Sequence, residues 1–193
     1  MTTRKYSPAL KPAVAGLRRL ALALALLSSA AALRAQESTR INVGFASAKP
    51  TDQIDIPVTF SGGEGTQAAS LTARVTFPKD ILTFDTAERA LAAELADAEV
   101  KATTADDKND KSLGVLELTV AGKTPIKPGI VAYVKFKVSK DAKKGELKLD
   151  LLDSSAKAAD GKPVELAKGD SGSVTLFGMD EEIPVVGCFF FTH

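Results

Sequence analysis

Few side chains of this 193-residue chain could carry out chemistry, and they lack the spacing of a catalytic centre. The one histidine is His193, the last residue of the sequence, and the one cysteine is Cys188. A nucleophile activated by a neighbouring base, as in Ser-His-Asp or Cys-His hydrolases, therefore cannot be assembled inside the domain. The same scarcity excludes a His/Cys cluster of the kind that binds zinc. These observations favour binding over catalysis.

Carboxylates are the remaining reactive groups, and 24 acidic residues could in principle supply a pair for glycoside hydrolysis. The densest group is Asp106-Asp107-Lys108-Asn109-Asp110, a charge run with the composition of a solvated loop. An EF-hand or dockerin loop starting at Asp107 would have Asn109 at its third position, but Lys111 and Ser112 stand where an oxygen ligand and a glycine are required. We expect no metal or other cofactor.

Direct glycan binding would use exposed planar rings that stack on sugars, and such rings are scarce. Tryptophan is absent, and beyond the first 35 residues Tyr133 is the only tyrosine. Its ring could be exposed, or it could pack between sheets or against an edge. Side chains alone therefore give little support to carbohydrate binding.

The residues that must form the scaffold are clearest at 128–138, where a Pro-Gly turn starts a strictly alternating run. Period-two alternation is typical of a strand with one face in a core. The predicted inward residues are Ile130, Ala132, Val134, Phe136 and Val138, and the predicted outward residues are Val131, Tyr133, Lys135 and Lys137. A second run after Lys143-Lys144-Gly145 places Leu147, Leu149 and Leu151 inward and Glu146, Lys148 and Asp150 outward.

Further alternating segments indicate strands along the rest of the chain. They lie at 41–45, 54–60, 71–77, 81–84, 98–103, 114–120 and 163–166, with a last strand through Val174 and Leu176. Because Pro57 cannot donate a ladder hydrogen bond, its strand should lie at an edge or place the proline where no bond is needed. About nine strands at this spacing predict an all-β fold, an antiparallel β-sandwich with jelly-roll topology.

One short helix is predicted over 85–96. Asp85 is a suitable N-cap, Glu88 stands three residues on as in a capping box, and Leu91 and Leu95 share one face. Its length and its many alanines predict a lid on the sandwich.

The first 35 residues have the pattern of a secretory signal peptide. A basic region precedes an apolar run from Leu20 to Leu27, and Ala30-Ala31-Ala32 or Ala35 offers a cleavage site. The apolar run is short for a membrane span, although an uncleaved anchor is the alternative. We expect a secreted or cell-surface protein, with residues 36–178 as one domain. The sequence after residue 35 has 19 basic and 24 acidic residues, a net charge of −5 that does not suit nucleic acid or an anionic membrane.

The segment 179–193 differs in character from the domain. Acidic residues at 180–182 precede Ile183-Pro184-Val185-Val186-Gly187-Cys188-Phe189-Phe190-Phe191, which is apolar and too short to span a bilayer. A sorting signal, a partner contact and the end of a truncated reading frame are all open interpretations of it.

These segments, taken in their order along the chain, resemble a cohesin domain, the module that docks dockerins in cellulosomes. Cohesin domains share a superfamily with certain carbohydrate-binding modules. The resemblance runs from Ile41 to Phe177, and its most specific piece is the Pro-Gly strand that ends in Phe136-Lys137-Val138. That strand is followed by 145–151, and the other four pieces are 54–58, 71–82, 114–120, and 160–164 leading to 172–176. One departure is Phe77-Pro78-Lys79, where such domains commonly carry Tyr-Asp-Pro.

The resemblance implies a recognition surface on the outward faces of the strands at 69–77, 114–120 and 146–151. Those faces offer the predicted partner-binding residues Thr72, Arg74, Glu117, Thr119 and Lys148. A surface that is small, polar and mixed in charge suits a protein partner. An ordinary solvated sheet face is the alternative, because antiparallel sheets often leave one side wet.

The sequence thus predicts a secreted, non-catalytic cohesin-like module that docks a dockerin-like partner in extracellular polysaccharide binding or degradation. The first alternative is a carbohydrate-binding module that contacts polysaccharide directly. The second is a structural or adhesive surface domain with the segment 179–193 as its anchor, and a hydrolase is the least favoured.

Overall fold

Alternating apolar and polar residues produce the strands of this computed structural model, which describes residues 38–63 and 65–184. Strand β3 (Gln53–Ser61) shows the pattern most clearly: Ile54, Ile56, Val58 and Phe60 are each at most 5% exposed, and their neighbours point outward. The predicted signal peptide and the residues after Pro184 lie outside the described residues. Within the described part, no helix is long and apolar enough to cross a membrane.

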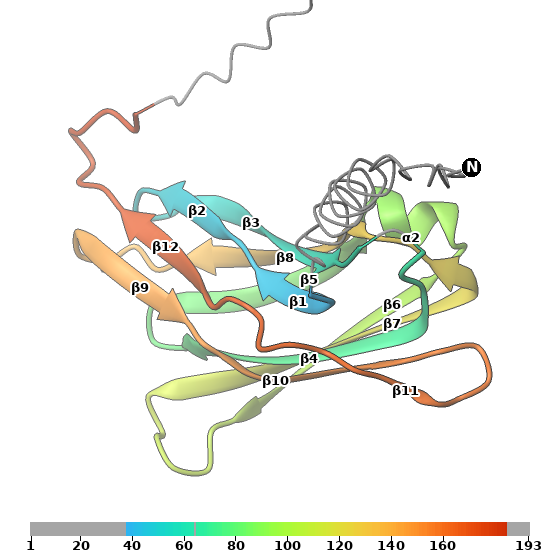
Figure 1. Cartoon of the computed structure of the whole chain (residues 1–193). Coiled ribbons are helices and arrows are strands. Elements are labelled where there is room, and N and C mark those ends of the chain that lie inside the picture. Colours follow the sequence, from blue (N-terminus) through green and yellow to red (C-terminus); the bar gives the residue numbers. More distant parts are fainter. Residues whose placement is uncertain (1–37, 64, 185–193) are drawn as a thin grey trace, which may run out of the picture. The chain divides into compact units, whose positions relative to one another are not determined.

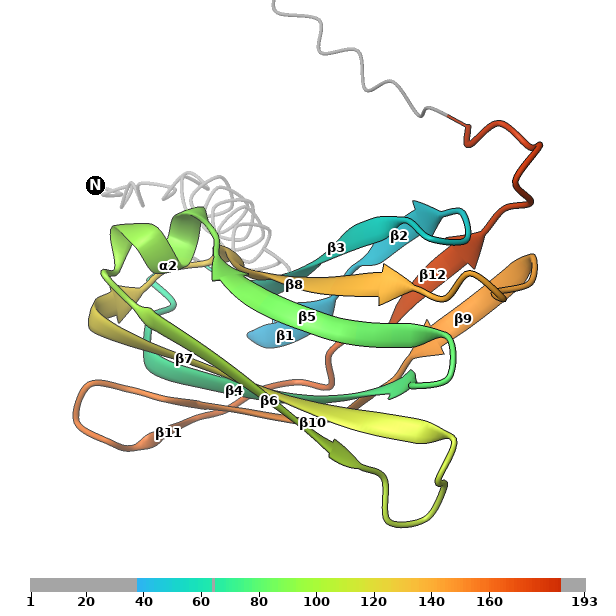
Figure 2. The ribbon, with the colours of Figure 1, turned by 180° about the vertical axis from the view of Figure 1, so that it is seen from behind.

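Three sheets make up the domain (Figures 1 and 2). The four-stranded sheet has the order β1 (Arg40–Val43), β3, β8 (Gly129–Val138), β5 (Leu82–Arg89). The five-stranded sheet has the order β11 (Pro163–Val164), β10 (Leu151–Lys157), β4 (Ala68–Pro78), β7 (Leu113–Ile126), β6 (Glu99–Asp106). The three-stranded sheet has the order β2 (Phe45–Ala48), β12 (Gly172–Leu176), β9 (Gly145–Leu149). The first two sheets form the facing layers of the predicted sandwich.

Aromatic packing joins the two layers. Phe77 on β4 and Phe136 on β8 have ring centroids 5.1 Å apart, and Phe84 on β5 meets Phe136 edge-on at 6.0 Å. Gly114 on β7 leaves room for Phe77, because a Cβ at that position would lie 2.5 Å from Cζ of the ring. The core is therefore continuous from one sheet to the other.

Two strands that the alternation predicts as continuous are in fact bent between sheets. The first changes sheet at Gly44, where a Cβ would lie 2.5 Å from Cγ of Pro57, so that β1 pairs with β3 but β2 pairs in parallel with β12. As a result Phe45, expected to continue the pattern of Ile41 and Val43, is 82% exposed. The prediction of a single strand at 41–45 was therefore wrong.

The second bend lies at Asp150, between β9 and β10. Strand β9 pairs with β12, whereas β10 pairs with β4, so the run of three leucines at 147–151 does not lie in one sheet. Because β1–β2 and β9–β10 each continue from a main sheet into the small one, the sandwich is joined along one end, as in a jelly roll.

The placement of Pro57 confirms the second of the two predicted alternatives. Strand β3 is internal, flanked by β1 and β8. The carbonyl of Pro57 accepts a hydrogen bond from the backbone N–H of Gly44 at 2.8 Å, which shows that its backbone faces the point where β1 ends at Val43. No ladder hydrogen bond is required there from the proline nitrogen.

The predicted helix at 85–96 was too long. Residues 82–89 form strand β5, and the helix α2 spans only Leu91–Leu95, with Ala90 as an N-cap that makes no side-chain hydrogen bond. Asp85 instead accepts hydrogen bonds from Lys137 on the adjacent strand β8 and from Gln53 on β3, the next strand of the sheet. Backbone pairing with β8 continues from Leu82 to Arg89, which keeps this segment extended. The helix does cover one end of the sandwich, and its own residues Ala92 and Ala93 are buried on the side that faces the core.

A bulge in β8 overturns one predicted orientation. Val58 pairs with Ala132 and Thr59 pairs with Ile130, so Val131 is an extra residue in β8. Val131 is 1% exposed instead of outward, and its carbonyl accepts a hydrogen bond from the N–H of Ala90 before α2. The alternation changes phase at this bulge, as expected of such irregularities.

Candidate functional site

The outer surface of the five-stranded sheet brings together four of the five predicted partner-binding residues. Strands β4 and β7 pair with Thr72 opposite Thr119 and with Arg74 opposite Glu117. We call this surface the polar face; it is formed by outward side chains of β10, β4, β7 and β6, among them Thr72, Arg74, Lys101, Thr103, Glu117, Thr119, Leu152, Asp153 and Ser155.

Arg74 lies at the centre of the polar face. Its Nη1 donates a hydrogen bond to Oδ2 of Asp153 on β10 at 2.9 Å, and its Nε lies 3.9 Å from Oε2 of Glu117 on β7. The side chains of all three residues are between 43% and 56% exposed. The guanidinium is thus held by a carboxylate on each side, yet it and both acids can still be reached from solvent.

Leu152 adds an apolar residue that the alternation did not predict. Strand β10 contains a bulge between Leu151, which pairs with Val75, and Asp153, which pairs with Arg74. Leu152 is therefore turned outward and is 48% exposed. It lines a depression of about 330 Å³ together with Arg74, Glu117 and the start of the loop after β6. The consecutive leucines at 151–152 are the one sequence signal that could have indicated it.

Lys148 does not join the other four residues. It lies on β9 in the three-stranded sheet, opposite Ser173 of β12. Its predicted grouping with β4 and β7 depended on one strand running through 146–151, and the change of sheet at Asp150 separates it from them.

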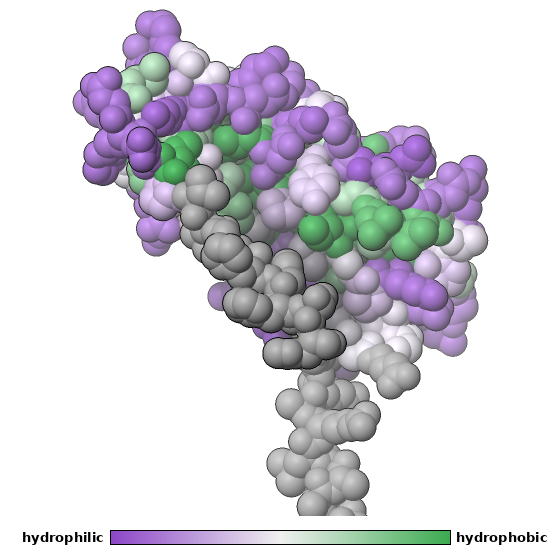
Figure 3. Space-filling model, turned by 90° about the horizontal axis from the view of Figure 1, so that it is seen from above, coloured by the Kyte–Doolittle hydropathy of each residue, from purple (hydrophilic) through white to green (hydrophobic). Residues whose placement is uncertain are grey.

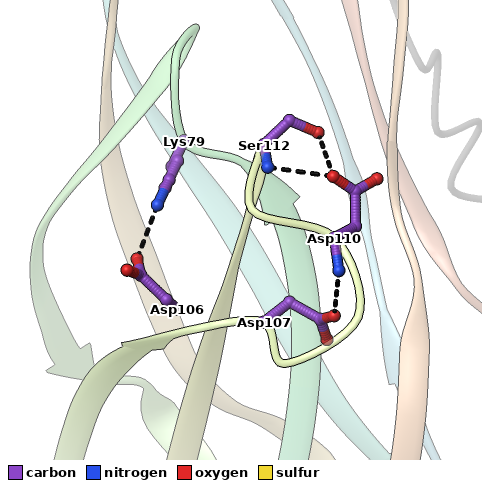
Figure 4. Close-up of polar contacts among 5 residues, drawn as sticks. All are labelled: Lys79, Asp106, Asp107, Asp110 and Ser112. Atoms are coloured by element: carbon purple, nitrogen blue, oxygen red, sulfur yellow. Dashed lines mark hydrogen bonds and ion pairs between the residues drawn. The ribbon is translucent and has the colours of Figure 1, made fainter.

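The charged loop between β6 and β7 lies at one end of the polar face (Figure 4). Oδ1 of Asp107 accepts hydrogen bonds from the backbone N–H groups of Asn109 and Asp110, at 2.7 and 2.9 Å. Oδ1 of Asp110 accepts from the N–H and the hydroxyl of Ser112, and these two donors lower the pKa of Asp110. Most of the loop is exposed, which confirms the solvated-loop interpretation.

The carboxylates of this loop already have donors from the chain itself. Asp106 accepts from Nζ of Lys79 at 2.6 Å, which ties the loop to the end of β4 (Figure 4). Among residues 38–63 and 65–184, no three His, Cys, Asp or Glu side chains are grouped as metal ligands. The geometry is that of a braced loop.

Known proteins share both the sequence pattern and this sheet arrangement. A family model of the cohesin domain matches residues 39–176. The chain belongs to the cohesin family. No curated protein gives a significant match.

Solved structures of other cohesins have the same fold at low sequence identity. One is a chain of the Coh-OlpA-Doc918 type I cohesin–dockerin complex from Clostridium thermocellum, with 16% identity, a TM-score of 0.59, and coverage of 72% of this chain and 99% of that one. A second is the third ScaC cohesin in complex with the ScaB dockerin from Acetivibrio cellulolyticus, with 18% identity, a TM-score of 0.58, and coverage of 72% and 98%. A third is a non-cellulosomal cohesin from the archaeon Archaeoglobus fulgidus, with 18% identity, a TM-score of 0.56, and coverage of 74% and 94%.

The departure at Phe77-Pro78-Lys79 has a clear structural consequence in this cohesin domain. Phe77 is 4% exposed and belongs to the core, so its ring is not available to a partner. Lys79 makes the ion pair with Asp106 and thereby orients the loop after β6. At the end of β4, the lysine beside the polar face is therefore already paired with a carboxylate of its own chain.

The outer face of the four-stranded sheet is also polar, but its charges form closed pairs. Lys135 on β8 pairs with Glu88 on β5 at 2.9 Å, and Lys137 pairs with Asp85 at 2.9 Å. The hydrogen bond to Glu88 raises the pKa of Lys135. These pairs lie between β8 and the edge strand β5, and they provide matched controls for the central Arg74.

Proposed function

We propose that this cohesin domain binds a dockerin-type protein module through the polar face. The observation that carries the proposal is the central Arg74, which bridges Asp153 and Glu117 on an otherwise open sheet surface. Membership of the cohesin family supports it, as do the solved structures of relatives that are described as cohesin–dockerin complexes.

The chemistry of the polar face indicates what such a partner must present. Hydroxyl groups of Thr72 and Thr119 and the carboxylates beside Arg74 offer hydrogen-bond acceptors, which suit serine, threonine, asparagine or basic side chains. Leu152 supplies an apolar contact among these polar groups. An apolar anchor surrounded by polar groups is typical of protein–protein interfaces.

Aromatic stacking on a sugar is not favoured on this surface. Phe77 is the only aromatic residue in the five strands of this sheet, and it is buried. Tyr133, which is 37% exposed, lies on β8 in the other sheet. Polysaccharide binding therefore remains the weaker proposal, to be tested by retardation of the protein in polysaccharide-containing native gels.

We propose in addition that the chain is exported through residues 1–35 and acts outside the cell in polysaccharide handling. The basic region and the apolar run of those residues support this proposal. Intact-mass analysis of the protein recovered from the culture medium tests it: loss of about 35 residues is expected from that pattern, and retention of Met1 would contradict cleavage.

The docking experiment uses the exported protein immobilised on a sensor and calcium-loaded dockerin modules as probes. Arg74→Ala leaves Asp153 and Glu117 as neighbouring carboxylates without their shared cation, and we expect it to weaken binding by about 2 kcal/mol, or roughly 30-fold. The matched control is Lys137→Ala, which removes an exposed ion pair from the opposite sheet. Equal loss in both variants, or no binding of any dockerin probe to the unaltered protein, would contradict the proposal.

A further inference from the structure

A second surface of the domain has a different chemistry from the polar face. Beside α2 lies a groove of about 660 Å³, a size in the range of pockets that bury ligands or side chains. Its lining is mainly apolar and comes from α2, the end of β7 and the start of β8. We call it the α2 groove; its apolar lining includes Leu91, Leu95, Pro125, Pro128, Ile130 and Tyr133, and Thr124 and Lys127 also line it.

The groove exposes more apolar surface than the fold requires. Leu91 and Leu95 are 67% and 77% exposed, although they occupy the one helix of the described domain. Figure 3 shows hydrophobic residues gathered on this face of the molecule with hydrophilic residues around them. A contiguous exposed apolar patch of this kind usually marks an interaction site.

The same chain contains a segment with the complementary chemistry. Residues 185–191 are Val-Val-Gly-Cys-Phe-Phe-Phe, without any charged or hydrogen-bonding side chain apart from the thiol. Each phenylalanine buries roughly 150–250 Å² when it enters an apolar site. Burial of all three rings would therefore give a large favourable free energy. We call residues 185–191 the apolar tail.

The length of the chain limits how much of the apolar tail could reach the groove of its own molecule. The segment before it is held near the Val138 end of β8: Lys49 donates to the carbonyl of Met179 at 3.0 Å, and Thr51 donates to the carbonyl of Val138. The groove lies at the other end of β8, beside Gly129, and the ten residues of this strand span about 30 Å. Figures 1 and 2 show the described residues after β12, up to Pro184, at the end of the domain opposite α2.

Lys144, in the turn that follows β8, holds Glu181 by a hydrogen bond to its carboxylate. From Glu181 to Phe189 is eight residues, which extend over at most about 29 Å. Even at full extension Phe189 does not reach the groove of its own molecule, so the three phenylalanine rings cannot enter that groove together. The groove of a second copy has no such restriction.

Charge placement agrees with this pairing. Lys127 lines the groove and is exposed. Asp180 and Glu182, just before the apolar tail, are exposed acids. A tail that enters a groove would bring these acids toward a lysine at its rim.

We propose that the apolar tail of one molecule docks in the α2 groove of a second copy of this chain, so that molecules associate head to tail. The groove and the tail are different surfaces, so the contact is heterologous and leaves one free groove and one free tail at the ends of each assembly. The association is independent of the polar face, which stays open to a partner.

The experiment measures self-association of the exported full chain by analytical ultracentrifugation over a broad concentration range. The groove variant Leu91→Ser/Leu95→Ser and the tail variant Phe189→Ser/Phe190→Ser/Phe191→Ser should each weaken self-association at least about tenfold, because each loses several apolar side chains from the contact. An unaltered protein that stays monomeric throughout would overturn the proposal.

Mixing the two variants distinguishes the proposed tail-to-groove contact from a groove-to-groove contact. The groove variant keeps a good tail and the tail variant keeps a good groove, so a one-to-one mixture should form dimers that cannot grow further. Absence of that dimer, with the tail variant still associating alone, would show a symmetric groove-to-groove contact and overturn the proposal. Association found only in molecules that retain residues 1–35 would show that the leader fills the groove, and would overturn it too.

Disulfide trapping supplies a positional check that does not depend on affinity. Thr124→Cys places a thiol at the exposed rim of the groove, and Cys188 is the only other cysteine. Mild oxidation should yield an intermolecular 124–188 disulfide identified by mass spectrometry of peptides. Exclusive formation of 188–188 dimers, as in the unaltered chain under the same oxidation, would contradict the docking of the tail at this rim.

Discussion

The polar face and the α2 groove differ in the free energy of leaving each surface exposed to water without a partner. On the polar face, Arg74 and its two carboxylates satisfy one another and remain hydrated, so the surface can face water without a partner. In the groove, Leu91 and Leu95 gain nothing from exposure. The comparison indicates that the polar face suits a reversible, selective contact, whereas the groove suits a contact that is occupied most of the time.

The two surfaces also differ in how they should respond to salt. Charged groups at an interface contribute mainly to selectivity and association rate, and salt screens them. Burial of leucine and phenylalanine is not weakened in this way. Binding at the polar face should therefore fall with added salt while self-association through the groove does not, which separates the two contacts in one protein.

Both surfaces rest on the same core, and the largest expected effect tests this. Phe136→Ala removes the ring that lies between Phe77 and Phe84, and it should lower the free energy of unfolding by about 3–5 kcal/mol. Denaturant unfolding measures the loss, with Lys137→Ala as a control that should change stability by less than about 1 kcal/mol. Under destabilising conditions both contacts should fail together. Loss of one contact at full retention of the other would show that the surfaces rest on separate parts.

Charge reversal at the centre of the polar face should separate the surfaces. Arg74→Glu places three carboxylates on neighbouring strands, and we expect it to weaken dockerin binding by more than about 2 kcal/mol, beyond the effect of Arg74→Ala. Self-association should be unchanged, because no residue of the polar face lines the groove. Surface titration against a dockerin probe and sedimentation of the same sample measure both. A parallel loss of the two contacts would refute their independence.

Substitution of the groove leucines should have little effect on the fold. Leu91→Ser/Leu95→Ser alters side chains that are already two-thirds or more exposed, so the free energy of unfolding should change by about 0.5 kcal/mol or less. Ala93→Leu, directly beside them but fully buried, should instead cost about 1–3 kcal/mol through overpacking. Unfolding curves at a concentration where the protein is monomeric measure both. A large loss in the leucine variant would mean that the groove is part of the core.

The polar face could largely be predicted from the sequence, and the physical reason is the period of a strand. The outward orientation of these residues of β4 and β7 follows from alternation, whereas their grouping on one surface was implied by the resemblance to cohesin domains. The structure confirms that Thr72, Arg74, Glu117 and Thr119 lie together. The bulge that exposes Leu152 has only the consecutive leucines at 151–152 as a signal in the sequence, and the bend that separates Lys148 has none. Each depends on how β10 is shared between β4 and the chain before it, which is a property of the assembled sheets.

The α2 groove could not be predicted because the local signal there was ambiguous. Asp85 and Glu88 have the spacing of a capping box, but pairing with β8 extends β5 through both residues and leaves the helix only five residues. A helix of 85–96 would have turned Leu91 and Leu95 toward the sandwich. In the short helix the buried positions are instead Ala92 and Ala93, and both leucines face outward.

The smallest expected effect concerns two carboxylates, one beside each binding system. Glu181, before the apolar tail, has its pKa lowered chiefly by its hydrogen bond to Lys144, from an ordinary value of 4.5. Asp110, beside the polar face, has its pKa lowered by neutral donors on Ser112, from an ordinary value of 3.8. Because both pKa values are depressed in the folded protein, each group stabilises it above its ordinary pKa. That contribution is lost as the pH falls through the folded value.

Titration of the side-chain carboxyl resonances by NMR measures both pKa values. Lys144→Met should raise the pKa of Glu181 toward 4.5 and leave the pKa of Asp110 unchanged. Ser112→Ala should raise the pKa of Asp110 and leave that of Glu181 unchanged. Added salt should raise the pKa of Glu181 more, because its partner is a charged ammonium group and the partner of Asp110 is not. Equal salt responses would mean that Lys144 does not hold Glu181 in solution, and the anchoring of the chain before the apolar tail would lose one of its contacts.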